Sequence, residues 1–596
     1  MRFVARMARR EVLFGALAGL LAGVVFALAM QAEQMRVEVT GLAGTSTSGA
    51  GLVVHLVLAT LIGAGVGLQY RHEPGSYAAQ ITLGVTFGLL GWILGPLTIR
   101  PLAEGIIPDW SIAVASAGFP SLMGHMLYGA LTVGGLYWAV QQWGSGAVLV
   151  RPGERAENRV QRIVVLGGGF GGMSAAQTLE RMTRRRRDLD VTLVSQSNFL
   201  LFTPMLAEVA SGALEAQHIA APIRAACPFT NFIHGDVERI DTEKRQVTVR
   251  SRRSTTPQAV PYDHLVLAMG SVPNFHGLPG LAEHAITLKT LEDAVGLRHR
   301  VLSQLERADH ESDPEVRQRL LTFVVAGGGF AGAETIAELF DLVSSVRRYY
   351  QNLGLADARF VLVHSRHRIL PELSAELGAY ALEKLSARGI EFRLGCRVAA
   401  AAEGSVTLDD GATIPCETFV WTAGNQPNPI LRDLGCAKNR AGQVVGDAAL
   451  QAPDTPGVWA VGDAAQIPDL TNEGQPCPPT AQHALRQGKR VSENIVATID
   501  GRQLKPFRYR ASGSLVGLGH RTAAAELWGH KFSGLLAWFM WRTIYLSKLP
   551  GLERKARVAL DWALDLVFPR DIVMTTAADG RYDPAAQPAA ERERAT

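Results

Sequence analysis

Residues 163–172 read IVVLGGGFGG, and residues 323–332 read FVVAGGGFAG. In each stretch an apolar, β-branched run leads into the spacing Gly-x-Gly-x-x-Gly, and a helical pattern follows. This order predicts a strand, a tight turn and a helix whose N-terminus holds a pyrophosphate, because free N–H groups and the helix dipole favour an anion. The two copies therefore predict two dinucleotide sites in one chain.

The three glycines of the motif have separate expected roles. The first allows the tight turn, the second lets the backbone approach the pyrophosphate, and the third lets the helix pack on the strand. These positions are Gly167, Gly169 and Gly172 in the first copy, and Gly327, Gly329 and Gly332 in the second. Two dinucleotides in one protein favour a hydride transfer from one to the other.

The composition of the 596-residue chain indicates several domains and a membrane part, since 47% of the residues are hydrophobic and only 19% are charged. A net charge of +4 is small for this length and gives no support for a nucleic-acid partner. The five cysteines are scattered without the spacing of a metal site, so we expect reduced thiols and no metal.

Four apolar stretches precede the first glycine motif, at about residues 12–30, 52–69, 78–98 and 111–140. Each is about long enough to cross a bilayer, which takes ~20 residues, and we expect the last span to begin near Pro120. The first exceeds the ~7–15 apolar residues of a signal peptide, which favours an uncleaved span. Basic residues flank the set: Arg2, Arg6, Arg9, Arg10, Arg151, Arg155, Arg159 and Arg162. The positive-inside rule then predicts a multi-pass protein of the cytoplasmic membrane, with the later domains on the cytoplasmic side.

Two histidines, His55 and His125, lie inside these apolar stretches. An ionisable group within a membrane is a candidate functional site, here a pair of haem ligands or a quinone contact. The alternative is two neutral histidines that form hydrogen bonds between closely packed helices. We favour the packing role.

The first dinucleotide site has an unusual ribose position. A carboxylate is expected after the second strand, residues 191–194, but Ser195 stands there. Far downstream, residues 458–465 read VWAVGDAA, and Asp463 offers a carboxylate at the end of a strand. This segment resembles the second flavin motif of the two-dinucleotide-binding flavoproteins. The resemblance implies that the first site binds FAD and that Asp463 holds its ribityl chain.

The second site would then take the nicotinamide cofactor. Glu334 follows the last glycine by two residues, close enough to contact a nicotinamide or flavin ring. After the strand at residues 360–363 comes HSRHR, where a glutamate would favour NADH. His364 and Arg366 instead favour tolerance of, or preference for, NADPH, because arginine is suited to bind phosphate. The alternative is a solvated basic loop.

Further segments resemble the type II NADH:quinone oxidoreductases, single-chain flavoproteins of respiratory membranes. They are FTPML at 202–206 with Glu208 and Gly212, YDHLVLAMGS at 262–271, WTAG at 421–424 with Asn428, and GLLAW at 534–538 with Trp541 and Arg542. The resemblance covers about residues 162–572. It implies a membrane-bound enzyme that passes a hydride from NADH or NADPH to FAD and two electrons on to a membrane quinone, without pumping protons.

The resemblance implies an α/β fold with two Rossmann-like domains, after an all-α four-helix transmembrane region and before C-terminal amphipathic membrane helices. The expected divisions are a transmembrane region at 1–150, an FAD domain at 160–290 and 426–505, an NAD(P)H domain at 291–425, a membrane-associated region at 506–575, and a disordered tail at 576–596. Partners are the quinone and the lipid bilayer. The resemblance leaves open whether the protein forms a homodimer.

The resemblance also assigns site residues. FAD contacts are expected from Gly167, Gly169, Phe170, Gly171, Gly172, Ser195, Ala268, Gly270, Gly462 and Asp463. Nicotinamide contacts are expected from Gly327, Gly329, Gly332, His364, Arg366 and Gly424, with Glu334 as the catalytic residue. The family's quinone motif Ala-Gln-x-Ala-x-Gln appears as AQHALRQ at 481–487, which implies Gln482, Arg486 and Gln487 as quinone contacts. Arg486 replaces the second glutamine, and Ser512 stands where the family often has lysine.

Two other functions remain as alternatives. A sulfide:quinone oxidoreductase shares the architecture but needs redox-active cysteines near the flavin, and none lies between Cys227 and Cys396. A membrane haem or transport module with a flavoprotein redox sensor rests on His55 and His125 alone.

Overall fold

The computed structural model divides the chain into two compact units, Met1–Leu149 and Val150–Thr596. The structure describes residues 2–32, 48–69, 77–103, 105, 106, 108, 118–143, 160–183, 186, 188–251 and 256–574. The expected disordered tail at 576–596 and three of the flanking arginines, Arg151, Arg155 and Arg159, lie outside these residues.

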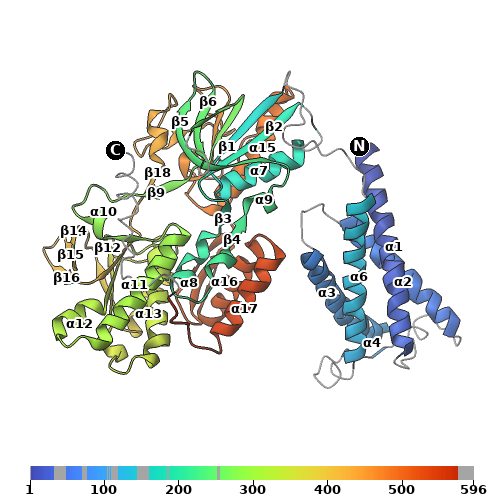
Figure 1. Ribbon diagram of the computed structural model, residues 1–596, viewed down its shortest axis with the longest axis horizontal. Helices are drawn as coiled ribbons and strands as arrows, with labels where there is room; N and C mark the ends of the chain where they lie inside the picture. Colours follow the sequence, from blue (N-terminus) through green and yellow to red (C-terminus); the bar gives the residue numbers. More distant parts are fainter. Residues whose placement is uncertain are drawn as a thin grey trace. The chain divides into compact units, whose positions relative to one another are not determined.

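The first unit is a bundle of helices (Figure 1). Its elements are α1 (Arg2–Ala32), α2 (Ser48–Gln69), α3 (Tyr77–Leu94), a π-helical turn at Gly95–Ile99, α4 (Arg100–Ala103) and α6 (Phe119–Trp143). Helix α6 has Pro120 in its first turn, where a missing N–H costs little.

Glycines let the helices of this unit approach closely. A Cβ on Gly15 of α1 would lie 2.3 Å from the carbonyl oxygen of Gly63 of α2, and one on Gly63 would lie 2.2 Å from that of Gly15. A Cβ on Gly88 of α3 would meet the backbone of His125 in α6 at 2.1 Å. Small residues four apart are the usual means of such packing between membrane helices.

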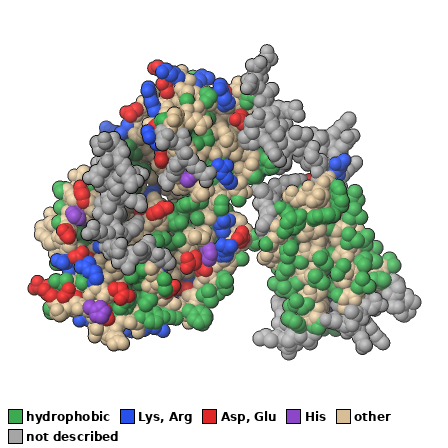
Figure 2. Space-filling view, viewed as in Figure 1, with side chains coloured by type: hydrophobic (Ala, Val, Ile, Leu, Met, Phe, Trp, Pro, Cys, Tyr) green, Lys and Arg blue, Asp and Glu red, His purple; other side chains and the backbone are tan. Residues whose placement is uncertain are grey.

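Figure 2 shows many hydrophobic side chains on the visible face of this unit. Leu13, Leu17 and Leu21 of α1, for example, are about half exposed or more. Among the described residues, two helices are long and apolar enough to cross a membrane, at Arg10–Ala29 and Gln80–Leu102, and Leu52–Leu68 is a shorter apolar helix. The prediction of four membrane spans is therefore not confirmed.

The second unit contains a seven-stranded sheet in the order β20-β8-β1-β2-β5-β6-β7. Strands β20, β8, β1, β2 and β5 are parallel, and β6 and β7 continue the sheet antiparallel. The bounds are β1 (Gln161–Leu166), β2 (Leu189–Ser195), β5 (Asn231–Asp241), β6 (Gln246–Ser251), β7 (Gln258–Pro261), β8 (His264–Leu267) and β20 (Val458–Ala460). Strand β1 is apolar at four consecutive buried positions because helices cover both faces of a parallel sheet.

A second sheet of five parallel strands has the order β10-β17-β11-β12-β13. Alternate residues of β11 face two different cores: Phe323 and Val325 pack with α11 and α13, and Val324 and Ala326 pack with the small sheet β14-β15-β16. The bounds are β10 (Ile286–Thr287), α11 (Leu291–His310), α12 (Pro314–Leu320), β11 (Thr322–Ala326), α13 (Phe330–Val346), β12 (Arg359–His364), α14 (Ala375–Ala387), β13 (Ile390–Leu394), β14 (Val398–Ala402), β15 (Ser405–Leu408), β16 (Thr413–Pro415) and β17 (Thr418–Trp421).

The chain returns to the first sheet after the second one. Helix α15 (Ala481–Ile499) packs on α7 (Phe170–Thr183), where a Cβ on Gly488 would lie 2.2 Å from the carbonyl oxygen of Gly171. Short elements connect the sheets: β3 (Phe199–Leu201), α8 (Leu206–Ala210), β4 (Ala220–Pro222), α9 (Ile223–Ala226), β9 (Ser271–Pro273), α10 (Leu281–His284), β18 (Asn425–Pro427), β19 (Val444–Val445) and β21 (Ala465–Gln466). This layout is an α/β dinucleotide-binding fold.

The C-terminal part packs against the second sheet's helices. A three-stranded antiparallel sheet precedes two helices. Its strands are β22 (Gly513–Gly517), β23 (Ala523–Leu527) and β24 (His530–Ser533), and the helices are α16 (Gly534–Lys548) and α17 (Leu552–Asp565). Figure 1 shows α16 and α17 beside α8, and Trp562 of α17 is hydrogen-bonded to Glu208 of α8. Both helices keep apolar side chains outside, including Leu536, Phe539 and Leu560.

Candidate functional site

The first glycine turn joins β1 to α7 and has the geometry that the motif predicts. Gly167 has a φ of +106°, and a Cβ there would lie 2.3 Å from the carbonyl oxygen of Ala268. A Cβ on Gly172 would lie 1.8 Å from the carbonyl oxygen of Gly167, so the helix packs on the strand with no room for a side chain. Gly169 has open space where a Cβ would be, which leaves the backbone accessible to a ligand.

The carboxyl end of the first sheet gathers the other residues predicted for FAD. Ser195 ends β2, and its hydroxyl oxygen lies 2.6 Å from where a Cβ on Gly168 would be. Gly270, with a φ of +64°, follows β8 and faces open space. These residues surround the turn at the sheet edge where α/β folds bind ligands.

Asp463 lies at the same edge, after β20. Its carboxylate accepts a hydrogen bond of 2.7 Å from the hydroxyl of Ser271, and Lys289 donates to that hydroxyl at 3.0 Å. Burial lowers the pKa of Lys289, while the charge of Asp463 opposes the shift. The backbone N–H of Gly462 donates to the side-chain carbonyl of Gln487 at 2.7 Å, which fixes the turn that carries Asp463.

The second glycine turn, between β11 and α13, repeats the first. Gly327 has a φ of +116°, and a Cβ on Gly332 would lie 1.7 Å from the carbonyl oxygen of Gly327. Thr422 crowds Gly327 at 2.5 Å from its Cβ position, as Ala268 crowds Gly167. Gly424 follows on the same loop, and its carbonyl oxygen accepts a hydrogen bond from the backbone N–H of Asn274. Both turns therefore satisfy the backbone requirements of a pyrophosphate site.

The residues around the second turn differ from those around the first. His364 ends β12, and its Nδ1 accepts a hydrogen bond of 3.1 Å from the N–H of Gly328, while its Nε2 is buried without a hydrogen-bond partner. Burial and the nearby Arg366 lower the pKa of His364, so the ring is neutral. Arg366 itself is exposed. The sequence did not point to Glu372, whose carboxylate lies 2.9 Å from the Cβ position of Gly329.

Glu334 lies in the first turns of α13 and is half-buried against the C-terminal part of the chain. Its carboxylate accepts a hydrogen bond of 3.0 Å from the N–H of Gly517 in β22. Burial raises the pKa of Glu334 to about 8, and the charge of Glu338, one helical turn later, adds to the shift. This carboxyl can therefore hold a proton at neutral pH, as a general acid or base must.

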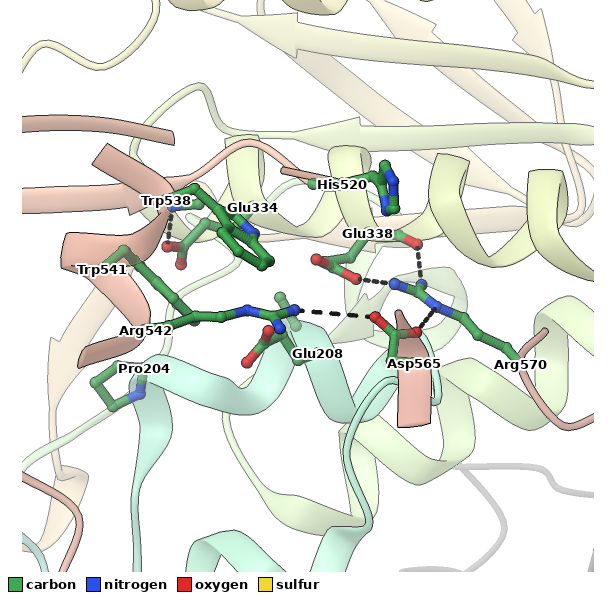
Figure 3. Close-up of a pocket in the computed structure, with 13 residues that line it drawn as sticks. Pro204, Glu208, Glu334, Glu338, His520, Trp538, Trp541, Arg542, Asp565 and Arg570 are labelled. Carbon is green, nitrogen blue, oxygen red and sulfur yellow. Dashed lines mark hydrogen bonds and ion pairs between the residues drawn. The ribbon is translucent and has the colours of Figure 1, made fainter. Parts of the chain in front are cut away.

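A cavity of about 20 Å³ adjoins Glu334 (Figure 3). Pro204, from the FTPML segment at 202–206, lines the same cavity. This shared lining brings the start of α13, after the second glycine turn, next to the loop that follows β3. Charged side chains complete the walls: Glu208, Glu338, Arg542, Asp565 and Arg570.

The residues predicted to contact quinone lie on the first half of α15. The side-chain carbonyl of Gln482 accepts a hydrogen bond of 2.7 Å from the hydroxyl of Tyr509, and the exposed guanidinium of Arg486 stacks over the Tyr509 ring at 4.0 Å. Gln487 points elsewhere: it is 2% exposed and hydrogen-bonds Gly462. Its position favours support of the Gly462 turn, and a quinone contact by Gln487 stays a prediction.

Comparisons with known proteins identify relatives of this chain. The profile of the pyridine nucleotide-disulphide oxidoreductases matches residues 161–488, and that of the NDH2 C-terminal domain matches residues 512–571. The type II NADH:quinone oxidoreductase Ndh of Mycobacterium tuberculosis is 32% identical over 427 residues, 69% of this chain and 89% of the relative. The chain belongs to the type II NADH:quinone oxidoreductase family.

Other relatives of the family agree with this assignment and differ in their acceptors. The external alternative NADH-ubiquinone oxidoreductase of Yarrowia lipolytica is 30% identical and covers 70% of this chain and 81% of the relative. The demethylphylloquinone reductase NdbB of Synechocystis is 30% identical, over 67% and 95%. The solved structure of NDH2 from Plasmodium falciparum in complex with NADH matches 70% of this chain and all of that one, with a TM-score of 0.65 at 18% identity. At this sequence identity, the structural likeness shows a shared fold and nothing further.

The alternative of a cysteine-dependent enzyme gains no support from the five cysteines, all of which are described and unpaired. Cys227, Cys416 and Cys436 are buried. Burial raises the pKa of Cys416 to about 12 and that of Cys477 to about 11, which disfavours the reactive thiolate.

Proposed function

We propose that this chain passes a hydride from NADH or NADPH to a bound FAD and two electrons on to a quinone. The observation that carries the proposal is the cavity shared by Glu334 and Pro204, because it joins the second nucleotide turn to the surroundings of the first. The relatives' printed activities, NADH:quinone and NADH-ubiquinone oxidoreduction, support the same reaction.

The first turn fits FAD by its backbone. The positive φ of Gly167 and the open space at Gly169 suit a pyrophosphate, and Asp463 offers a carboxylate to the ribityl hydroxyls. Ser195 can donate or accept a hydrogen bond at a ribose. Bound FAD would supply the chemistry of hydride acceptance and stepwise electron release. The protein would orient the two ligands.

The second turn would hold the pyrophosphate of the nicotinamide nucleotide. Arg366, exposed beyond β12, can pair with a 2′-phosphate, and no carboxylate occupies the end of this strand to repel one. We therefore propose that NADPH is accepted as well as NADH. The alternative, a solvated basic loop, predicts no effect of Arg366 on either nucleotide.

Quinone is proposed to bind at Gln482 and Arg486 of α15. The guanidinium on the Tyr509 ring is held in place on an exposed surface, where it can donate to a quinone carbonyl and stabilise a reduced anion. The exposed apolar side chains of α16 and α17 would face the lipid from which a quinone arrives.

The helical unit is proposed to anchor the enzyme as a four-helix bundle in the cytoplasmic membrane. Its exposed leucines and its glycine contacts support this, and two of its helices have the length and composition of spans. His55 and His125 fit a packing role: their rings contact backbone carbonyls of Gly23 and Ser121, and the Phe26 ring packs edge-on against both. A haem between the two histidines would have to displace Phe26.

Stopped-flow spectroscopy tests the function. The bound flavin should be bleached by NADH and by NADPH under anaerobic conditions, and a soluble quinone should restore its colour. Bleaching by neither nucleotide would refute the proposal. A strong preference for NADH would refute the role of Arg366 only. A Soret band lost on His125→Ala substitution would revive the haem alternative.

A further inference from the structure

A second and larger cavity lies between the second glycine turn and the C-terminal sheet. Its volume is about 720 Å³, and its walls are residues 372–374, residues 510–514, and the end of β23 with the turn that follows, at Glu526, Trp528 and Gly529. No residue lines both this cavity and the one beside Glu334. A volume of this order suits a small-molecule ligand. The name hairpin cavity is used for it below.

One end of the hairpin cavity lies at the second glycine turn. The backbone N–H of Leu370 donates to the carbonyl oxygen of Gly328 at 2.7 Å, which holds the segment before the cavity on the turn. Glu372, on the cavity wall, has its carboxylate 2.9 Å from the Cβ position of Gly329. A nucleotide whose pyrophosphate rests on this turn therefore lies beside the cavity.

The other end of the hairpin cavity is bonded to the helix that contacts the first glycine turn. The side-chain amide of Gln482 in α15 donates to the carbonyl oxygen of Gly513, on the cavity wall, at 3.3 Å. Two residues later in α15, the carbonyl oxygen of Ala484 lies 3.6 Å from the Cβ position of Gly171. The cavity thus leads from the second turn towards the first. The nicotinamide half of a bound nucleotide must follow this direction to reach FAD.

Trp528 stands in this cavity wall in an unfavourable backbone conformation. Leu527 pairs with His530, so Trp528 and Gly529 alone form the turn between β23 and β24. Their φ angles are +50° and +81°, the pattern of a type I′ turn, for which Asn-Gly is the preferred pair. A bulky side chain at positive φ is an outlier, and such outliers cluster at ligand sites.

Neither core packing nor lipid contact explains the indole of Trp528. The side chain is 75% exposed. Its surroundings are charged: the exposed Glu372 and Arg510 line the same cavity, and Lys531, three residues further on, forms an ion pair of 2.7 Å with Glu376. A strained, exposed aromatic ring among charged groups suits a flat ligand that carries polar substituents.

We propose that Trp528 stacks on the nicotinamide ring of bound NADH or NADPH and so positions it for hydride transfer. The proposal deepens the proposed function and rests on it. The indole offers the ring a flat apolar face, and the hydroxyls of Ser512 and Ser514 on the same wall can bond its carboxamide. Trp528 takes up neither electrons nor protons in the reaction. The contact with the ring offsets the unfavourable backbone of the turn.

Equilibrium binding to the full-length protein with FAD tests the contact. The flavin is first reduced chemically, so that added NADH binds without turnover and its fluorescence reports the Kd. Trp528→Asn should raise the Kd of NADH and of NADPH by about tenfold, within the range known for a base stacked on an aromatic side chain. The Kd of ADP-ribose, which lacks the nicotinamide ring, should change less than about twofold. Trp528→Phe should keep the NADH affinity within about threefold of the wild type.

Thermal unfolding without nucleotide gives a second measurement, with the opposite sign. Trp528→Asn should raise the unfolding temperature by about 1–3 °C, because Asn-Gly suits the turn and little packing is lost. The matched control is Arg245→Asn, at an exposed position with a φ of +51° between β5 and β6. It should also raise the unfolding temperature, but should leave the Kd of NADH unchanged.

Several results would overturn the proposal. They are an unchanged Kd of NADH in Trp528→Asn, an equal loss of affinity for ADP-ribose, and a lowered unfolding temperature. A raised KM for quinone with unchanged NADH binding would assign the cavity to quinone instead. Weaker binding to lipid vesicles with unchanged NADH binding would make Trp528 a membrane contact. Failure of the wild-type protein to bind NADH would overturn the proposed function itself, and this result is separate because it needs no variant.

Discussion

The two glycine turns are nearly identical in backbone and different in their surroundings. The third glycine of each leaves no room for a Cβ, at 1.8 Å for Gly172 and 1.7 Å for Gly332. The second glycine faces open space in the first turn, at Gly169, but the carboxylate of Glu372 in the second, at Gly329. The backbone geometry suits a pyrophosphate at both turns, and we expect the neighbouring side chains to determine which dinucleotide each turn binds.

The largest expected difference between the two turns comes from adding a side chain at the third glycine of each. Gly172→Ala should prevent FAD retention, because a Cβ would overlap backbone, with a loss of at least ~2 kcal/mol of stability. Gly332→Ala should retain FAD, since the two sheets have separate cores, but should slow bleaching by NADH by about 10²-fold or more.

The measurements are the flavin absorbance per chain and the anaerobic rate of bleaching. Gly91→Ala, on α3 with nothing within 4 Å, is the control and should change neither. Loss of FAD from both site variants alike would mean that the turns are not independent.

The next largest effect is expected from substitution of Glu334, a residue that follows the second glycine turn and has no counterpart at the first. Glu334→Gln should lower the turnover with quinone by about 10²-fold, because the amide cannot release a proton. FAD content should stay at the wild-type level. An unchanged turnover would remove Glu334 from the reaction.

The raised pKa of Glu334 also predicts a pH dependence of stability. The folded protein holds this proton more tightly than the unfolded chain, since the pKa of Glu334 is raised to about 8, so the free energy of unfolding falls as the pH rises towards 8. The slope contributed is about 1.4 kcal/mol per pH unit between about 4.5 and 8. Thermal unfolding of Glu334→Gln should show a shallower fall over this range. Parallel curves for the variant and the wild type would contradict the assigned proton.

The smallest effects concern the nucleotide that the second turn accepts. Arg366→Ala should lower kcat/KM for NADPH by about tenfold and leave that for NADH unchanged, because only NADPH has the 2′-phosphate that arginine can bind. Glu372→Gln should raise the affinity for both nucleotides a few-fold, since it removes a negative charge near the pyrophosphate. Equal effects of Arg366→Ala on kcat/KM for both nucleotides would favour the alternative that the basic segment HSRHR is a solvated loop.

The sequence predicts those parts of the molecule that depend on near neighbours in the chain. The glycine turns follow from strand, turn and helix patterns within ten residues, and Asp463 follows from an apolar strand that ends in Gly-Asp. The cavity could not be predicted, because Glu208, Glu338, Asp565 and Arg570 come from distant segments and only the packed fold brings them together. The same holds for Glu372 and for Gln487, whose bond to Gly462 depends on the position of α15. Hydropathy predicts four membrane spans, and among the described residues two helices meet the length and composition required.

The most direct test of the account is an experimental structure of the full chain with FAD and NADH bound. We expect the FAD pyrophosphate on the turn of Gly167–Gly172, the NADH pyrophosphate on the turn of Gly327–Gly332, and Glu334 beside the two facing rings. An NADH bound on the first turn, or one whose ring lies away from Glu334, would contradict the central claim that the two turns hold a donor and an acceptor for one hydride transfer.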